Sequence, residues 1–149
     1  MGFNSAKIDL LNKTYDKMKK LLTFTTVIEA TTGLMMIAFP AFITTLLLGS
    51  SPDTLFSTTI TRIAGVAIFA IGIVSWLSRY DVKSVASRGL VTALIFYNAG
   101  ILIVLLFTGT ALGFFCPGLW LVVIVHAVMT SWGIYIQLHQ SRSSFSRPF

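Results

Sequence analysis

Apolar residues occur along this chain in four long runs that short polar segments separate. The runs cover approximately residues 21–39, 56–78, 89–107 and 118–138. Each is close to the ~20 residues that a helix needs to cross the hydrocarbon core of a bilayer. A helix on the surface of a soluble protein has a polar face, and these runs have none. The pattern therefore predicts an all-α integral membrane protein, a bundle of four transmembrane helices in a single domain.

The segment before the first run, residues 5–20, has an amphipathic pattern. Its apolar residues recur at spacings of three and four and are Ile8, Leu11, Tyr15 and Met18. The opposite face carries Lys13, Lys17 and Lys20. Such a helix lies in the headgroup layer with its basic side toward anionic lipid. We expect an N-terminal interfacial helix at 5–20, with Ser5 as its N-cap and these lysines on lipid headgroups.

Pro40 divides the first apolar stretch. A straight helix over residues 21–49 would be about 43 Å long, more than the ~30 Å hydrocarbon core requires. Proline removes a backbone donor and ends or restarts a helix. We expect the first span to end near Phe39 and a short helix to follow from Pro40 to Leu48, stopped by Gly49.

The basic residues assign a topology. The net charge is +6, and ten of the eleven Lys and Arg residues precede the first run, lie between the second and third, or follow the fourth. The segments 49–55 and 108–117 contain none. Positively charged residues stay on the cytoplasmic side, so both termini are expected there. This distribution indicates a membrane protein and gives no reason to expect nucleic-acid binding. The residues at 140–149 are rich in Ser and Arg and are expected to form a loose cytoplasmic tail.

Each apolar run contains one strongly polar residue. These residues are Glu29, Arg62, Asn98 and His126. At 1.5 Å per residue, Glu29, Asn98 and His126 lie about 13, 15 and 16 Å from the cytoplasmic ends of their spans, and Arg62 lies at about 25 Å. Polar groups at such depths face the bundle interior and pair with one another. They predict an intramembrane polar cluster that is either structural, holding helices together, or functional; a metal site is disfavoured.

Small and hydroxylated residues mark a second feature of the first two spans. The first span has Thr25, Thr32 and Gly33 near Glu29, and the second has Gly65 and Gly72 on the stripe that includes Arg62. Small residues at helical spacing let two backbones approach closely. We expect a helix-packing face formed by Thr25, Thr32, Gly33, Gly65 and Gly72.

Motifs for other chemistry are missing from the sequence. It has no phosphate-binding glycine loop, no Cys-x-x-Cys pair and no supported nucleophile, so no catalytic residue, metal or cofactor is assigned. Its single cysteine, Cys116, is expected to be a small apolar filler near the outer surface or to form an intermolecular disulfide.

Four segments carry a family resemblance: "VIEATTGLMMIAFPAFITTLLLG", "TRIAGVAIFAIGIVSWLSR", "LIFYN" and "IVHAV". They resemble a broad group of small bacterial four-helix membrane proteins that is loosely DoxX-like. The resemblance covers residues 21–138 and maps Glu29, Pro40, Arg62, Gly65, Asn98 and His126 onto recurring positions of the group. It implies a bacterial inner-membrane location. The redox and sulfur metabolism of DoxX proteins proper is not carried over, because this chain lacks a suitable cysteine arrangement.

Three functional hypotheses follow from these observations. The first is a non-enzymatic accessory subunit, or a binder of a lipid or quinone-like molecule, that uses the small-residue faces of the first two spans. Its partners would be membrane lipids and another membrane protein or a second copy. The second is an oligomeric transporter or proton-conducting bundle with Glu29 and His126 as relay groups. The third is a membrane enzyme that uses the same pair on a lipid-like substrate, and it is the least favoured because no nucleophile or cofactor is present.

Overall fold

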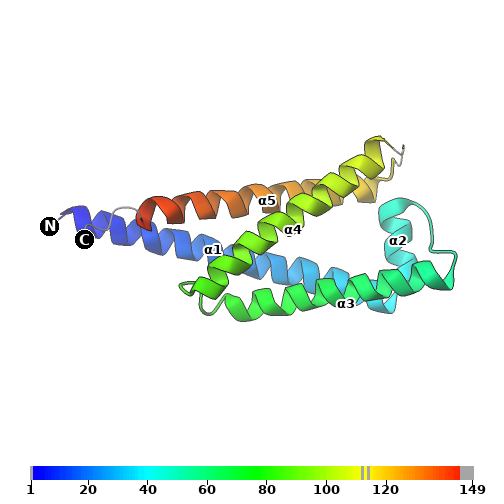
Figure 1. Cartoon of the computed structure of the whole chain (residues 1–149), viewed down its shortest axis with the longest axis horizontal. Helices are drawn as coiled ribbons and strands as arrows, with labels where there is room; N and C mark the ends of the chain where they lie inside the picture. Colours follow the sequence, from blue (N-terminus) through cyan, green and yellow to red (C-terminus); the bar gives the residue numbers. More distant parts are fainter. Residues whose placement is uncertain (1, 112, 114, 145–149) are drawn as a thin grey trace.

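The described part of the chain forms five helices (Figure 1). The computed structural model describes residues 2–111, 113 and 115–144. The helices are α1 (Gly2–Ala38), α2 (Pro40–Leu48), α3 (Leu55–Ser78), α4 (Val85–Thr110) and α5 (Pro117–Ser144). All but α2 are long and apolar enough to cross a membrane. The prediction of an all-α protein with four membrane-spanning helices is confirmed.

Local sequence signals explain where the helices begin and end. Pro40 occupies the first turn of α2, and Gly49 closes that helix in the left-handed conformation at φ 70°. The short helix from Pro40 to Leu48 is therefore present as the sequence predicts. Thr54 caps α3 through a reciprocal pair of bonds with Ser57, and Ser84 caps α4 by accepting from the Ser87 amide.

The amphipathic N-terminal segment is not a separate interfacial helix. Residues 5–20 belong to α1, which runs without interruption from Gly2 to Ala38. Ser5 is therefore not the N-cap. Of the apolar stripe, Met18 is fully buried, whereas Ile8 is 52% exposed. The prediction of a separate helix was wrong, because no residue between 16 and 24 breaks a helix. The position of this part of α1 in the headgroup layer stays a prediction.

The C-terminal segment also continues a helix. The expected loose tail at 140–149 is helical as far as Ser144, and residues 145–149 lie outside the described part of the chain. Gln140 is buried, and its Nε2 donates to Met18 Sδ at 3.3 Å. Packing of α5 on the N-terminal part of α1 orders this segment in spite of its polar composition.

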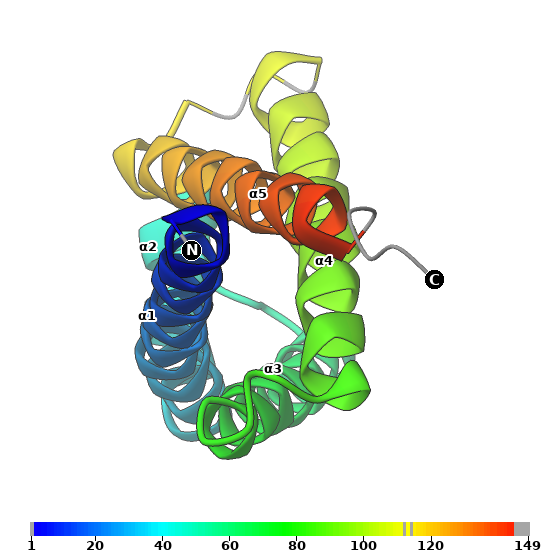
Figure 2. The ribbon, with the colours of Figure 1, turned by 90° about the vertical axis from the view of Figure 1, so that its left-hand side faces the viewer.

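The four long helices form two antiparallel pairs. α3 packs along α1, α4 packs along α5, and the pairs are joined mainly by α1 against α5 (Figure 2). α3 and α4 are consecutive in sequence but touch each other little. The N-terminal end of α1, the α3–α4 connection and the C-terminal end of α5 lie toward one end of the molecule (Figure 1). α2 lies at the other end and packs against the start of α5.

The buried core lies where α1, α4 and α5 meet. Its residues are Met18, Leu21, Leu22, Val91, Leu94, Met129 and Ile136. Outside this core, large apolar side chains are exposed on every long helix; for example, Phe96 is 76% and Ile103 is 68% exposed. Exposed apolar surface on this scale is unfavourable in water but natural in lipid tails. The chain is therefore a small multi-pass membrane protein.

Candidate functional site

Glu29 is placed inside the bundle by the buried stripe of α1. Met18, Leu22, Thr25 and Glu29 follow one another at spacings of three and four, and all four are buried. The Glu29 side chain is only 4% exposed. A carboxylate in apolar surroundings is costly unless a hydrogen-bond donor meets it. The partner of Glu29 therefore defines the site.

Tyr97 on α4 is that partner. Its hydroxyl donates to Glu29 Oε2 over 3.1 Å, and this bond links α4 to α1. Tyr97 is half-buried. Tyr97 was not predicted as a site residue, because a tyrosine in an apolar run resembles an ordinary packing residue. The available signal was its position beside Asn98 at the depth of the other polar residues.

His126 on α5 lies beside the same tyrosine. The ring centroids of Tyr97 and His126 are 6.2 Å apart and the rings are tilted by 51°. His126 Nδ1 is 2.9 Å from the Val122 carbonyl oxygen of its own helix. A carbonyl only accepts, so Nδ1 carries a proton in this contact. Nε2 then has a free lone pair in the neutral ring, and no hydrogen bond to it is present in the described part of the chain.

Helix register brings Glu29 and His126 to the same level. α1 and α5 run antiparallel, and Phe24 meets Trp132 with ring centroids 6.3 Å apart. Glu29 lies five residues after Phe24 on α1, and His126 lies six residues before Trp132 on α5. Residues on three helices, Glu29, Tyr97 and His126, thus form one group, which we call the interior polar site.

The other two predicted members of the cluster are not joined to it. Asn98 is 2% exposed, but its Nδ2 donates to the Leu94 carbonyl of its own helix at 2.7 Å. Arg62 lies exposed on α3, with no hydrogen bond or ion pair to a described residue. Arg62 is therefore not part of the predicted cluster, because its side chain is exposed on the surface of the bundle.

The glycine face packs α1 against α3. A Cβ built on Gly65 would lie 2.8 Å from the Gly33 carbonyl oxygen, and one built on Gly72 would lie 2.7 Å from the Ala30 amide nitrogen. Only glycine permits such close backbones. These two faces cover each other within the chain. They are therefore not free to bind a partner or a ligand, which the first functional hypothesis required.

The threonines of this face have different surroundings. Thr25 is fully buried, and its hydroxyl has no hydrogen-bond partner in the described part of the chain. Thr25 lies one helical turn before Glu29 on α1. Thr32 is half-buried. Neither side chain bonds to the interior polar site.

The lysines predicted to contact lipid headgroups occupy two kinds of position. Lys13 and Lys20 are exposed. Lys17 is half-buried and donates to the Tyr135 hydroxyl of α5 at 2.7 Å. It therefore links α1 to α5 at the end of the molecule where α1 begins and α5 ends (Figure 1). Contact of any of the three with lipid headgroups stays a prediction.

The interior polar site offers mostly hydrogen-bond acceptors. The Tyr97 hydroxyl donates its one hydrogen bond to Glu29, so lone pairs on the oxygens of both residues remain as acceptors. A neutral His126 adds the lone pair of Nε2. The described residues include no group of three or more His, Cys, Asp or Glu side chains able to hold a metal ion. The geometry therefore suits proton exchange or a ligand that donates hydrogen bonds.

Comparisons with models of known protein families, with curated proteins and with solved structures found no match to this chain. The DoxX-like resemblance stays a prediction.

Proposed function

We propose that this membrane protein is non-enzymatic and binds a hydrophobic ligand with a small polar head at the interior polar site. The observation that carries the proposal is Glu29, a buried carboxylate whose one hydrogen-bond partner in the described part of the chain is the neutral Tyr97 hydroxyl. A carboxylate has about four lone-pair positions, so most of its capacity is unused. A ligand that supplies donors would stabilise it.

The acceptor-rich chemistry narrows the ligand class. Glu29, Tyr97 and a neutral His126 complement a ligand with hydroxyl donors, such as a lipid with a hydroxylated head or the reduced form of a quinone-like molecule. The apolar helices around the site suit the hydrophobic part of such a ligand. The role fits an accessory protein that holds the ligand for another membrane protein or for a second copy of itself.

A location follows from the charge distribution. We place the protein in a bacterial inner membrane, with both termini in the cytoplasm, because ten of its eleven basic residues fall in segments that this topology puts inside. The N-terminal end of α1 and the C-terminal end of α5 lie toward the same end of the molecule, as this topology requires (Figure 1). The bacterial origin rests on the DoxX-like resemblance.

Ligand extraction tests the proposal. The protein is purified in a mild neutral detergent, and co-purifying small molecules are extracted and quantified by mass spectrometry. We expect one hydroxyl-bearing hydrophobic species at near-stoichiometric amount in the wild type. Glu29→Gln and Tyr97→Phe should reduce it several-fold, whereas Asp81→Asn, on the exposed α3–α4 connection, should not. A monomer that carries no lipid or ligand, or equal ligand in all variants, would contradict the proposal.

A proton relay is the second candidate function. It is favoured by the position of Tyr97, whose hydroxyl bonds Glu29 while its ring lies beside His126. Protons could pass along such a line of titratable groups if an oligomer supplied the rest of the path. Proton flux into proteoliposomes should then fall in Glu29→Gln and His126→Ala. Flux that is unchanged in both variants would exclude this function.

A further inference from the structure

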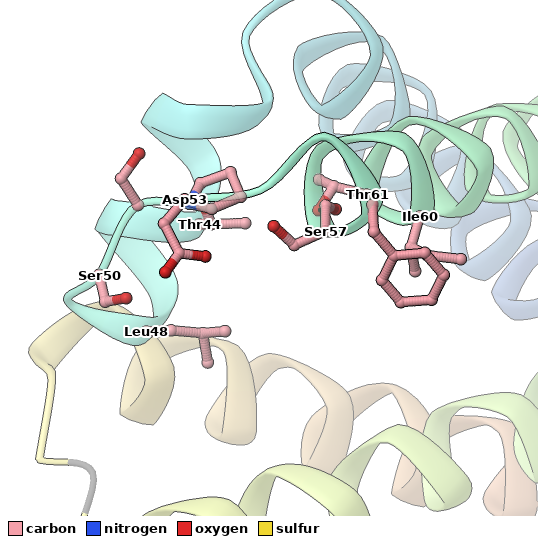
Figure 3. Close-up of a pocket in the computed structure, with 10 residues that line it drawn as sticks. Thr44, Leu48, Ser50, Asp53, Ser57, Ile60 and Thr61 are labelled. Carbon is pink, nitrogen blue, oxygen red and sulfur yellow. The ribbon is translucent and has the colours of Figure 1, made fainter.

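A pocket lies between α2 and α3 (Figure 3), at the end of the molecule opposite the N-terminal end of α1 (Figure 1). Its volume is about 420 Å³. Its lining combines polar and apolar residues: Thr44, Leu48, Ser50, Ser51, Pro52, Asp53, Phe56, Ser57, Ile60 and Thr61. This pocket is separate from the interior polar site, and none of its lining residues belongs to that site.

Three of the five hydroxyl groups that line the pocket donate a hydrogen bond to a backbone carbonyl. Thr44 donates to the Pro40 carbonyl at 3.0 Å, and Thr61 donates to the Ser57 carbonyl at 2.9 Å. The Ser57 hydroxyl donates to the Thr54 carbonyl at 3.0 Å. Each hydroxyl has one proton, so what remains for a ligand is oxygen lone pairs. These side chains therefore act as acceptors toward the pocket.

Asp53 adds a negative charge to these acceptors. Figure 3 shows its carboxylate and the Ser57 hydroxyl directed into the same open space. The carboxylate is not needed to cap α3, because Thr54 already accepts from the Ser57 amide at 3.0 Å. Asp53 makes no ion pair or hydrogen bond to another described residue, and the segment 49–55 contains no Lys or Arg. Its charge therefore faces the pocket uncompensated.

The other wall of the pocket is apolar and faces outward. Phe56 is 76% exposed and Ile60 is 50% exposed, both on the first turns of α3, and Leu48 completes this wall from α2. Apolar groups of a ligand would lie against these side chains, and the Phe56 ring would also attract a cation. The pocket thus pairs an anionic part that is rich in acceptors with an apolar part.

We infer that this pocket binds the ammonium head of an amphiphile, either an aminophospholipid of the outer leaflet or a free hydrophobic amine. An ammonium group carries three donors, no acceptor and one positive charge, and these properties complement Asp53 and the hydroxyl lone pairs. Heads that carry a phosphate or carboxylate but no ammonium group are disfavoured, because they would bring net negative charge against Asp53.

Charge variants of Asp53 test the inference. The protein in a neutral maltoside detergent is offered phosphatidylethanolamine and phosphatidylglycerol in equal amounts, and bound lipid is counted by native mass spectrometry. We expect the wild type to prefer phosphatidylethanolamine about threefold or more, Asp53→Asn to lose the preference, and Asp53→Lys to reverse it. Asp81→Asn, an equal charge change at the other end, should behave as wild type. Wild-type ratios in both Asp53 variants would overturn the inference.

A soluble competitor shows whether the ammonium head belongs to an aminophospholipid or to a free hydrophobic amine. Hexylammonium should compete with phosphatidylethanolamine for the wild type, whereas hexanol, which has the same chain without the charge, should not. Hexylammonium binding that depends on Asp53, without any lipid preference, would assign the pocket to a free amine and still support ammonium recognition. Equal competition by hexanol would overturn the inference. Asp53→Asn should leave the amount of ligand extracted from the interior polar site unchanged, so failure of the proposed function and failure of this inference are distinguishable.

Discussion

Glu29 shows how much one contact matters inside a membrane protein. The residue is almost fully buried, and the Tyr97 hydroxyl is the group that compensates its carboxylate. In water such a bond would exchange with solvent and contribute little, but acyl chains offer no alternative donor. The hydrogen bond therefore fixes the rotation of α4 relative to α1 as well as supplying the site.

Removal of the Tyr97 hydroxyl should destabilise the protein. Tyr97→Phe keeps the ring but leaves Glu29 without its donor, and we expect a loss of about 1–3 kcal/mol in the free energy of unfolding. Thermal or SDS-induced unfolding in detergent, followed by circular dichroism, measures this change. Tyr80→Phe is the matched control, because Tyr80 is 67% exposed after the end of α3. Equal effects of the two substitutions would contradict the role assigned to Tyr97.

At the scale of elements, α1 is the helix on which the fold depends. It packs against α3 through glycines and against α5 through the core, while α3 has few other neighbours in the described structure. Helix association in lipid gains little from the hydrophobic effect and relies on close packing and hydrogen bonds. The attachment of α3 therefore rests on Gly33, Gly65 and Gly72.

Gly65→Ala should weaken the α1–α3 pair. The added Cβ would lie 2.8 Å from the Gly33 carbonyl oxygen and from Met36 Cβ, so the helices must separate. We expect a loss of about 1–3 kcal/mol, measured by the same unfolding assay. Gly100→Ala on α4 is the control, since nothing lies within 4 Å of its Cβ. It should be neutral or stabilising by up to about 1 kcal/mol. Similar losses in both variants would contradict the packing assigned to Gly65.

For the whole molecule, the two ends differ in charge. One end has the lysine-rich start of α1 and the α3–α4 connection, whereas the other has α2 and the pocket around Asp53 (Figure 1). This asymmetry is what orients a polytopic protein during insertion. The interior polar site lies between the basic end of the molecule and the end that carries the pocket.

Cysteine labelling in intact cells tests the orientation. In a Cys116→Ser background, Ala111→Cys and Lys83→Cys introduce thiols at exposed positions near opposite ends. A membrane-impermeant maleimide should label Ala111→Cys in intact cells and Lys83→Cys only after permeabilisation. The reverse pattern would show that the termini lie outside, and the leaflet assigned to the pocket would change with it.

The sequence predicted two residues of the interior polar site and missed the third. The depths of Glu29 and His126 follow from their positions along apolar runs, because a helix rises by a constant step. Tyr97 was missed because its role depends on α4 facing α1, which no local pattern states. Arg62 was assigned to the cluster because it is the one strongly polar residue of its apolar run, but its helix meets the bundle through glycines and leaves the arginine exposed.

By itself the sequence determined that the chain lies in a membrane, how many helices span it, and that the first apolar stretch breaks at Pro40. These are local properties: hydrophobic length, a missing backbone donor and capping residues act within a few turns of one helix. Only the tertiary structure decided that residues 5–20 extend α1, that the glycine faces cover each other, and that Tyr97 joins Glu29. Each of these depends on the rotation and register of helices distant in the chain, which packing sets once the helices meet.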